Sequence, residues 1–220
     1  MKTIFFLTFL TCASFSAAGF SQTDQLEAIE SLSSNDFSAY DQTYQTQIIN
    51  FRKVNAGIYS GARLQTLEDH RYLRSLGIKS VINLQGGDLH SKLGKIIPWS
   101  EQGELPEVIE NERRTSVLLG MSFVNIPLNS LDPVSTNDDK AIDGILEYMN
   151  DAKHQPLYIH CEHGADRTGL LIALYRVKYE GIDAKTARAE WIKNGHNLLH
   201  RMFTGDLDTY FFQKIKEFEQ

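Results

Sequence analysis

A chain of 220 residues with 42% hydrophobic and 23% charged residues has a globular composition, with room for one domain and a smaller segment. Its formal net charge of −6 argues against nucleic acid or an anionic membrane surface as a partner. The apolar run at the N-terminus is too short to cross a membrane as an ordinary helix, so we expect no stable membrane insertion.

The first 18 residues are predicted to be a secretory signal peptide. Lys2 gives a short basic start, residues 4–12 form a brief apolar core, and small residues at 16–18 suit cleavage before Gly19. The sequence therefore predicts an exported protein, periplasmic or secreted.

Cleavage would change the charge and the cysteine content of the chain. Loss of Lys2 leaves 21 basic and 28 acidic residues, a formal charge of −7, and loss of Cys12 leaves Cys161 as the sole cysteine. Such a chain cannot form an internal disulfide, and a lone thiol in an oxidising compartment is exposed to oxidation. A chemical role therefore explains Cys161 better than a buried structural thiol does.

The mature chain is expected to consist of a leader and one domain. Residues 19–49 are rich in Ser, Gln, Asp and Thr with scattered apolar positions, which predicts a mostly flexible leader with a short helix at 26–29. The domain is expected over residues 50–220.

The start of the domain carries clear local signals. Residues 57–62 and 78–84 are predicted to be strands. Between them, Thr66 and Asp69 match the start of a helix with a capping box, and that helix is expected to end before Gly77.

The signals over residues 85–120 are weaker. Glycines and prolines indicate loops, with a helix within 106–119, and residues 123–128 return to strand. The loop is expected to leave three side chains in solvent rather than in a pocket: His90, Lys92 and Lys95.

Helices dominate the rest of the chain. A helix is expected to start at Thr136, and its apolar stripe is Ile142, Ile145, Leu146 and Met149. After a short buried strand at 157–159, helices are predicted over 170–179, where Gly181 follows, and over 183–191, where Asp183 is the cap. A last helix carries Leu207, Phe211, Ile215 and Phe218 on one side.

The alternation of strands with helices predicts an α/β domain. Its central sheet should be mainly parallel and flanked by helices. In such sheets the ligand site lies at the carboxyl ends of the strands, where the strand at 157–159 leads into a cysteine.

The loop that follows this strand is predicted to hold a phosphate group. It reads Cys161-Glu162-His163-Gly164-Ala165-Asp166-Arg167-Thr168-Gly169, and an apolar helical run follows. Backbone N–H groups of such a loop and of the first helical turn converge on one point, and the helix dipole adds about half a positive charge there.

Three side chains make this predicted phosphate-binding loop reactive. The amides and the dipole favour the thiolate of Cys161, which is a nucleophile. Arg167 can hold two phosphate oxygens at once through its planar fork, and the hydroxyl of Thr168 can assist the sulfur when it leaves. A nucleophilic sulfur beside a phosphate clamp predicts phosphoryl transfer through a phosphocysteine.

These residues resemble a known family. His160, Cys161, the five-residue spacing to Arg167, and the following Thr-Gly are similar to the signature of the cysteine-dependent tyrosine and dual-specificity phosphatases, and most similar to the compact bacterial dual-specificity-like members. The likeness continues upstream at residues 50–61 and 76–84. It implies a tyrosine-phosphatase-like fold. A sulfurtransferase would require a shorter loop before its arginine.

The resemblance also implies an aspartate that protonates the leaving group, in a loop before the active-site strand. Asp132, followed by Pro133, fits this place, although the tryptophan-proline-aspartate order of the family is absent. Asp138 and Asp139 are the alternatives, but both fall in a helical first turn, where the dipole alone favours acids. A mechanism without a side-chain acid is the third possibility.

The remaining loop residues are expected to bind or support. The substrate-binding set is Glu162, His163, Gly164, Ala165, Asp166 and Arg167, through backbone N–H groups and rim side chains. His160 is expected to position the loop rather than act as a base, because a thiolate needs none. His163 either contacts a substrate oxygen or faces water. Two acids beside the site argue against a highly phosphorylated substrate.

The sequence thus predicts a phosphatase that hydrolyses phosphotyrosine, with phosphoserine and phosphothreonine as further substrates. The expected partner is a phosphorylated protein or a small phosphomonoester, and no cofactor or metal ion is expected. One alternative is an inositol-phosphate or phosphoinositide phosphatase of the same superfamily. Another, of a different class, is a non-catalytic module that binds phosphorylated ligands. The oligomeric state stays open.

Overall fold

The sheet at the centre of the domain has five strands. The computed structural model describes residues 48–87, 103–129, 136–196 and 205–219, all within one compact unit, Asp36–Gln220. The strand order is β1-β2-β5-β3-β4. The strands are β1 (Arg52–Lys53), β2 (Ile58–Ala62), β3 (Ser80–Asn83), β4 (Ser122–Asn125) and β5 (Leu157–Cys161).

Strand β5 lies in the middle of the sheet and is parallel to both neighbours. Cys161 is paired with Ala62 of β2, and His160 is paired with Asn83 of β3. The expected mainly parallel sheet is therefore confirmed, with β1 as the antiparallel exception. The two-residue β1 was not predicted, because so short a strand has no periodic pattern to detect.

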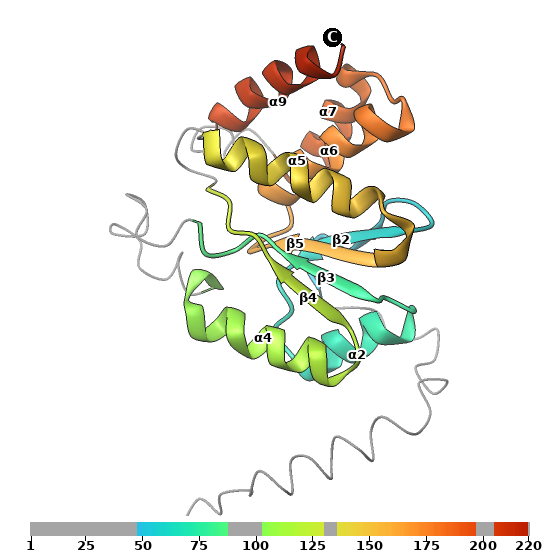
Figure 1. Cartoon of the computed structure of the whole chain (residues 1–220), viewed down its shortest axis with the longest axis vertical. Coiled ribbons are helices and arrows are strands. Elements are labelled where there is room, and N and C mark those ends of the chain that lie inside the picture. Colours follow the sequence, from blue (N-terminus) through green and yellow to red (C-terminus); the bar gives the residue numbers. More distant parts are fainter. Residues whose placement is uncertain (1–47, 88–102, 130–135, 197–204, 220) are drawn as a thin grey trace, which may run out of the picture. The chain divides into compact units, whose positions relative to one another are not determined.

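Two helices cover one face of the sheet, α2 (Leu67–Ser75) and α4 (Pro106–Leu118) (Figure 1). The predicted capping box is present, since Thr66 Oγ1 accepts a hydrogen bond from the Asp69 N–H and the Asp69 carboxylate accepts one from the Thr66 N–H. Helix α4 begins with proline at its first position, where no intrahelical N–H is needed.

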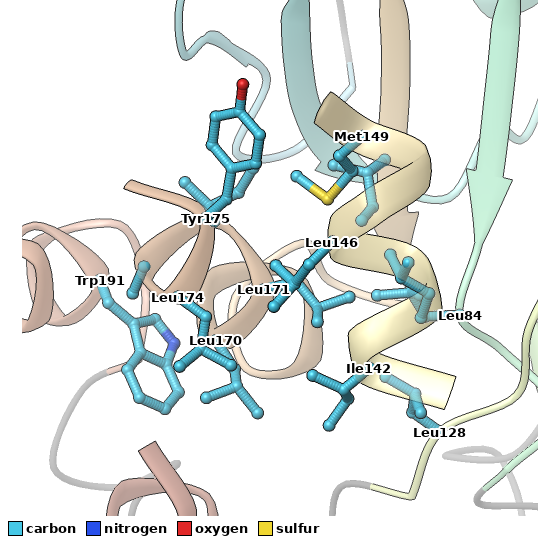
Figure 2. Packing of buried hydrophobic residues seen from close by; sticks show 14 of the residues in the cluster. Leu84, Leu128, Ile142, Leu146, Met149, Leu170, Leu171, Leu174, Tyr175 and Trp191 are labelled. Atoms are coloured by element: carbon cyan, nitrogen blue, oxygen red, sulfur yellow. The ribbon is translucent and has the colours of Figure 1, made fainter. Parts of the chain in front are cut away.

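On the other side of the sheet lie α5 (Thr136–Asn150) and α6 (Arg167–Glu180), and α7 (Ala184–Lys193) and α9 (Gly205–Phe218) pack on α6. A short 3₁₀ turn, η3 (Ala152–His154), follows α5. The stripe predicted on α5 is buried against α6, as Figure 2 shows for Leu146 beside Leu171. Gly181 ends α6 in the left-handed region, and Asp183 caps α7, both as expected.

Side chains of β5 alternate between the two helical layers. Leu157, Ile159 and Cys161 pack in the cluster formed with α5 and α6, whereas Tyr158 packs in the cluster formed with α2. His160 points to the same side as Tyr158, because it lies against Glu112 of α4. Strand β5 is thus buried on both faces, which explains the apolar run over residues 157–159.

Several expectations fall outside the described residues. These are the signal peptide at 1–18, most of the leader at 19–49, and the solvated loop with His90, Lys92 and Lys95. Within the described ranges, no helix is both long and apolar enough to span a bilayer.

Candidate active site

Cys161 is the last residue of β5 and is buried, with 3% of its surface exposed. Five residues separate it from Arg167, the first residue of α6. The helix starts three residues earlier than predicted, so Arg167 and Thr168 stand in its first turn. The N-terminus of α6, which is the positive end of the helix dipole, therefore directly follows the loop.

Two glycines let the loop close. Gly164 has a φ of 69°, and a Cβ there would collide with the backbone of Gly61 and Ala62 in β2. A Cβ at Gly169 would collide with the ring of Trp191. The loop therefore packs against β2 on one side and α7 on the other, and larger residues would displace it.

The guanidinium of Arg167 is buried and held in place by four acceptor oxygens from three residues. Nη2 donates to Glu104 Oε1 at 2.7 Å, and Nη1 lies 3.2 Å from Glu104 Oε2. Nη1 also donates to the carbonyls of Leu84, at 3.1 Å, and Leu128, at 3.2 Å. These contacts orient the planar fork before any ligand arrives, which is the arrangement that electrostatic catalysis requires.

Glu104 was not predicted from the sequence. It is 1% exposed, and besides Arg167 its Oε2 accepts a hydrogen bond from the Gly86 N–H at 2.5 Å. It lies 63 residues before Arg167, in a stretch without a clear pattern. The local sequence Glu104-Leu105-Pro106 matches no motif for an arginine partner, so only the tertiary structure shows that Glu104 pairs with Arg167.

The side chain of Glu162 was expected at the rim of the loop, but its carboxylate is bound by two neighbouring side chains. Its Oε1 forms a salt bridge with Arg63 Nε at 2.9 Å, and its Oε2 accepts from Gln85 Nε2 at 2.7 Å. The salt bridge compensates one of the two acidic charges that were expected to weaken the anion site. The argument against polyanionic substrates is correspondingly weaker.

Asp166 also turns away from the rim. Its Oδ1 lies 2.7 Å from Nδ1 of His196, which is fully buried and stacks on Trp191 with ring centroids 4.0 Å apart. Trp191 Nε1 donates to the Ala165 carbonyl at 2.9 Å. The end of α7 and the turn after it thus hold the second half of the loop, a support that no sequence pattern indicated.

His160 lies on the side of β5 opposite Cys161. Its Nε2 is 2.8 Å from Glu112 Oε1 of α4, and its Nδ1 is 3.3 Å from the Cys161 carbonyl. Glu112 Oε2 accepts a hydrogen bond from Asn83 Nδ2 at 2.7 Å. This geometry agrees with a positioning role for His160, because the ring contacts the backbone of the loop.

The remaining loop residues occupy distinct environments. Thr168 is fully buried, and its Oγ1 has no hydrogen-bond partner among the described residues. His163 is exposed, and its carbonyl accepts a hydrogen bond from Asn50 Nδ2 at 2.9 Å. Gly164 and Ala165 are buried in the turn.

The predicted general acid, Asp132, lies outside the described residues. Of its two competitors, Asp139 is bound to α9, where it accepts hydrogen bonds from Tyr210 Oη at 2.5 Å and Lys214 Nζ at 3.0 Å. The hydrogen bond from Tyr210, followed by Lys214, lowers the pKa of Asp139. A carboxyl group with a lowered pKa is a poor proton donor, which disfavours Asp139 in this role. Asp138 keeps its place as an alternative.

Several acidic and histidine side chains lie around the loop. In the part of the chain that the structure describes, no group of three or more His, Cys, Asp or Glu side chains is placed to hold a metal ion.

Known proteins share this fold. The structure superposes on TpbA from Pseudomonas aeruginosa with a TM-score of 0.57 at 20% identity, over 77% of this chain and 88% of that one. The catalytic core of the PP-IP phosphatase Siw14 from S. cerevisiae, solved with citrate, gives 0.52 at 21% identity, over 76% and 89%. At such identities the likeness shows the fold alone.

Sequence comparisons go further. A stretch of 59 residues is 36% identical to the dual specificity protein phosphatase TpbA of P. aeruginosa strain UCBPP-PA14, and it covers 26% of this chain and about a quarter (27%) of that relative. A family model described as a DSP-PTPase phosphatase fused to NAD+ kinase matches residues 32–203. Because that match includes more than three quarters of the 220 residues, the chain belongs to the DSP-PTPase family of dual-specificity-like phosphatases.

Proposed function

We propose that the protein is a cysteine-dependent phosphoric monoester hydrolase that acts on phosphotyrosine, and on phosphoserine and phosphothreonine as further substrates. The observation that carries the proposal is the buried, pre-oriented guanidinium of Arg167 in the first turn of α6, five residues after a cysteine at the end of β5. A positive fork, a helix N-terminus and a nucleophile around one point suit phosphoryl transfer.

In the proposed first step, Cys161 Sγ attacks phosphorus as a thiolate, and the bond from phosphorus to the leaving oxygen breaks. Asp132 donates its proton to that oxygen, and Arg167 with the loop amides holds the three equatorial oxygens. In the second step, water attacks the phosphocysteine and gives its proton to Asp132. The sulfur leaves as a thiolate, which the Thr168 hydroxyl stabilises, and inorganic phosphate is released. No step needs a metal ion or a cofactor.

Two substrate classes occur among the solved structures that resemble this fold. A TpbA variant has been solved with phosphotyrosine, whereas Siw14 is a PP-IP phosphatase. An inositol-phosphate phosphatase is therefore the second candidate, and the salt bridge between Glu162 and Arg63 favours it by compensating one acid beside the loop.

A substrate panel tests the proposal. We expect kcat/KM for a phosphotyrosine peptide to exceed that for inositol hexakisphosphate by about tenfold or more, a difference of about 1.4 kcal/mol in transition-state binding. The assay is phosphate release in the presence of EDTA, with vanadate as the inhibitor. A higher kcat/KM for inositol hexakisphosphate than for the phosphotyrosine peptide would establish the inositol-phosphate alternative. Vanadate binding without turnover of any substrate would establish the non-catalytic binding module.

Replacement of Asp132 by asparagine tests the acid. Turnover of an alkyl phosphate, whose leaving group needs a proton, should fall by about 10²-fold or more, whereas p-nitrophenyl phosphate should lose much less. Asp138→Asn tests the alternative acid and should affect both substrates little, whereas a selective loss in this variant would move the role to Asp138. Equal losses on the two substrates would remove Asp132 from the role.

We also propose that the enzyme works after export and removal of residues 1–18. The support is the N-terminal sequence pattern. Mass determination of the chain recovered from the periplasm or the medium of the source cells checks this, because an uncleaved intracellular chain would contradict it.

A further inference from the structure

A second concave site lies along α6. A cavity of about 270 Å³ opens between β1 and helices α6 and α7. The loop residues 161–166 are not among the described residues that line it. It shares only Gly169, in the first turns of α6, with the active-site segment. The two sites are therefore neighbours with different walls.

The lining of this cavity is cationic in an acidic chain. Its charged residues among those described are Arg52, Lys53, Arg176, Lys193 and Glu190. Four positive charges and one negative charge meet there, although the whole chain carries a formal charge of −6. Concave surfaces of one sign concentrate ions of the opposite sign.

Three of these cations, Arg52, Lys53 and Lys193, have no ionic partner among the described residues, although Lys53 lies over the ring of Tyr59. Arg176 forms salt bridges with Glu180 and with Glu190, so these three charges largely satisfy one another. Among the described residues, neither Arg52 nor Lys193 has a hydrogen-bond acceptor or a salt bridge. The net excess of positive charge in the cavity is thus carried by groups that are available to a ligand.

Arg52 stands out because it is half-buried. Burial lowers the pKa of its guanidinium, and Cys161 and Glu190 only partly offset this effect. Burying a charge without a partner is costly unless something else compensates it. The guanidinium of Arg52 lines the cavity without an acidic partner among the described residues, so an anion in the cavity would compensate its charge.

We propose that the cavity lined by Arg52 and Lys193 is a second anion site, which binds a phosphate or carboxylate group independently of the Cys161 loop. Guanidinium and ammonium groups are the side chains that bind such groups in proteins. The anion either belongs to a substrate that carries several phosphates or is a separate small molecule. The shared chemistry is an oxyanion.

Tungstate, a heavy phosphate analogue, tests the site. Titration calorimetry of the full-length chain should give two tungstate ions per chain, and anomalous diffraction from a soaked crystal should place one in the loop and one beside Arg52. Arg52→Gln should weaken the second site by about tenfold or more and leave the loop site occupied. Lys193→Gln, at an exposed position, should weaken it less.

The matched control is Arg114→Gln, since Arg114 is an exposed arginine of α4 that pairs with Glu110 and lines no part of the cavity. It should retain both tungstate ions. A single ion, bound only in the loop, would overturn the second site. A single ion beside Arg52 would support it and contradict the proposed function instead, so the two failures are distinguishable.

Kinetics separates the two sources of the anion. If the group belongs to the substrate, Arg52→Gln should raise the KM for inositol hexakisphosphate by about tenfold or more and that for p-nitrophenyl phosphate far less. If it is a separate molecule, sulfate should inhibit the wild type with a second, non-competitive component that Arg52→Gln removes. Either pattern supports the site, and identical behaviour of Arg52→Gln and wild type in both assays would overturn it.

Discussion

Replacement of Cys161 by serine is expected to reduce turnover of phosphotyrosine peptides by about 10⁴-fold or more. A serine hydroxyl remains protonated at neutral pH and is a far weaker nucleophile than a thiolate. The side chain is buried at the end of β5, and serine nearly matches its shape, so the fold should be retained. Single-turnover kinetics with a phosphotyrosine peptide gives the size of the loss, and circular dichroism checks the fold.

The serine variant should still bind ligands in the loop. Arg167 keeps its contacts with Glu104 and with the carbonyls of Leu84 and Leu128, so the phosphate clamp does not depend on the sulfur. A tight complex of Cys161→Ser with an unhydrolysed phosphopeptide is therefore expected. Full activity in this variant, or in a wild type whose sulfur has been alkylated, would exclude the phosphocysteine.

Glu104→Gln is expected to cost about 3–5 kcal/mol in the free energy of unfolding. Glu104 and Arg167 are 1% and 4% exposed, and glutamine would leave a buried guanidinium without its counter-charge. Turnover should also fall, by about 10²-fold, because an amide NH2 replaces one of the two carboxylate oxygens that orient the fork of Arg167. Urea unfolding followed by circular dichroism measures the first effect, and steady-state kinetics measures the second.

The control for this substitution lies on the neighbouring helix. Glu110 of α4 pairs with Arg113 and Arg114 at the surface, where solvent screens the charges. Glu110→Gln should therefore leave the urea midpoint nearly unchanged. If both variants unfolded at the same urea concentration, the pair between Glu104 and Arg167 would have no special importance for stability.

Features that depend on a few neighbouring residues were predictable from the sequence. The capping box at Thr66, the stripe on α5, the glycine after α6 and the cap at Asp183 each depend on neighbours within one or two turns. The Cys-x5-Arg loop is equally local. Such short-range patterns are sufficient to predict the mainly parallel sheet, the helices around it and the reactive loop.

Contacts between distant segments could not be predicted in this way. Glu104, Glu112 and His196 lie 63, 48 and 30 positions from the residues that they contact in or beside the loop. Each is an ordinary acid or histidine in its local sequence, and its role arises only when the helices pack. The same holds for Arg52, whose unmatched charge is visible only beside α6 and α7.

The support of the loop from both helical layers limits how far the chain can be shortened. Glu112 reaches it from α4 through His160, while Trp191 and His196 reach it from the C-terminal region through Ala165 and Asp166. A fragment that stops after α6 would contain Cys161 and Arg167 yet lack half of the scaffold that shapes their loop. The unit that shapes the loop therefore extends at least to His196, and a protease cut between α6 and α7 would disturb the loop without touching Cys161 or Arg167.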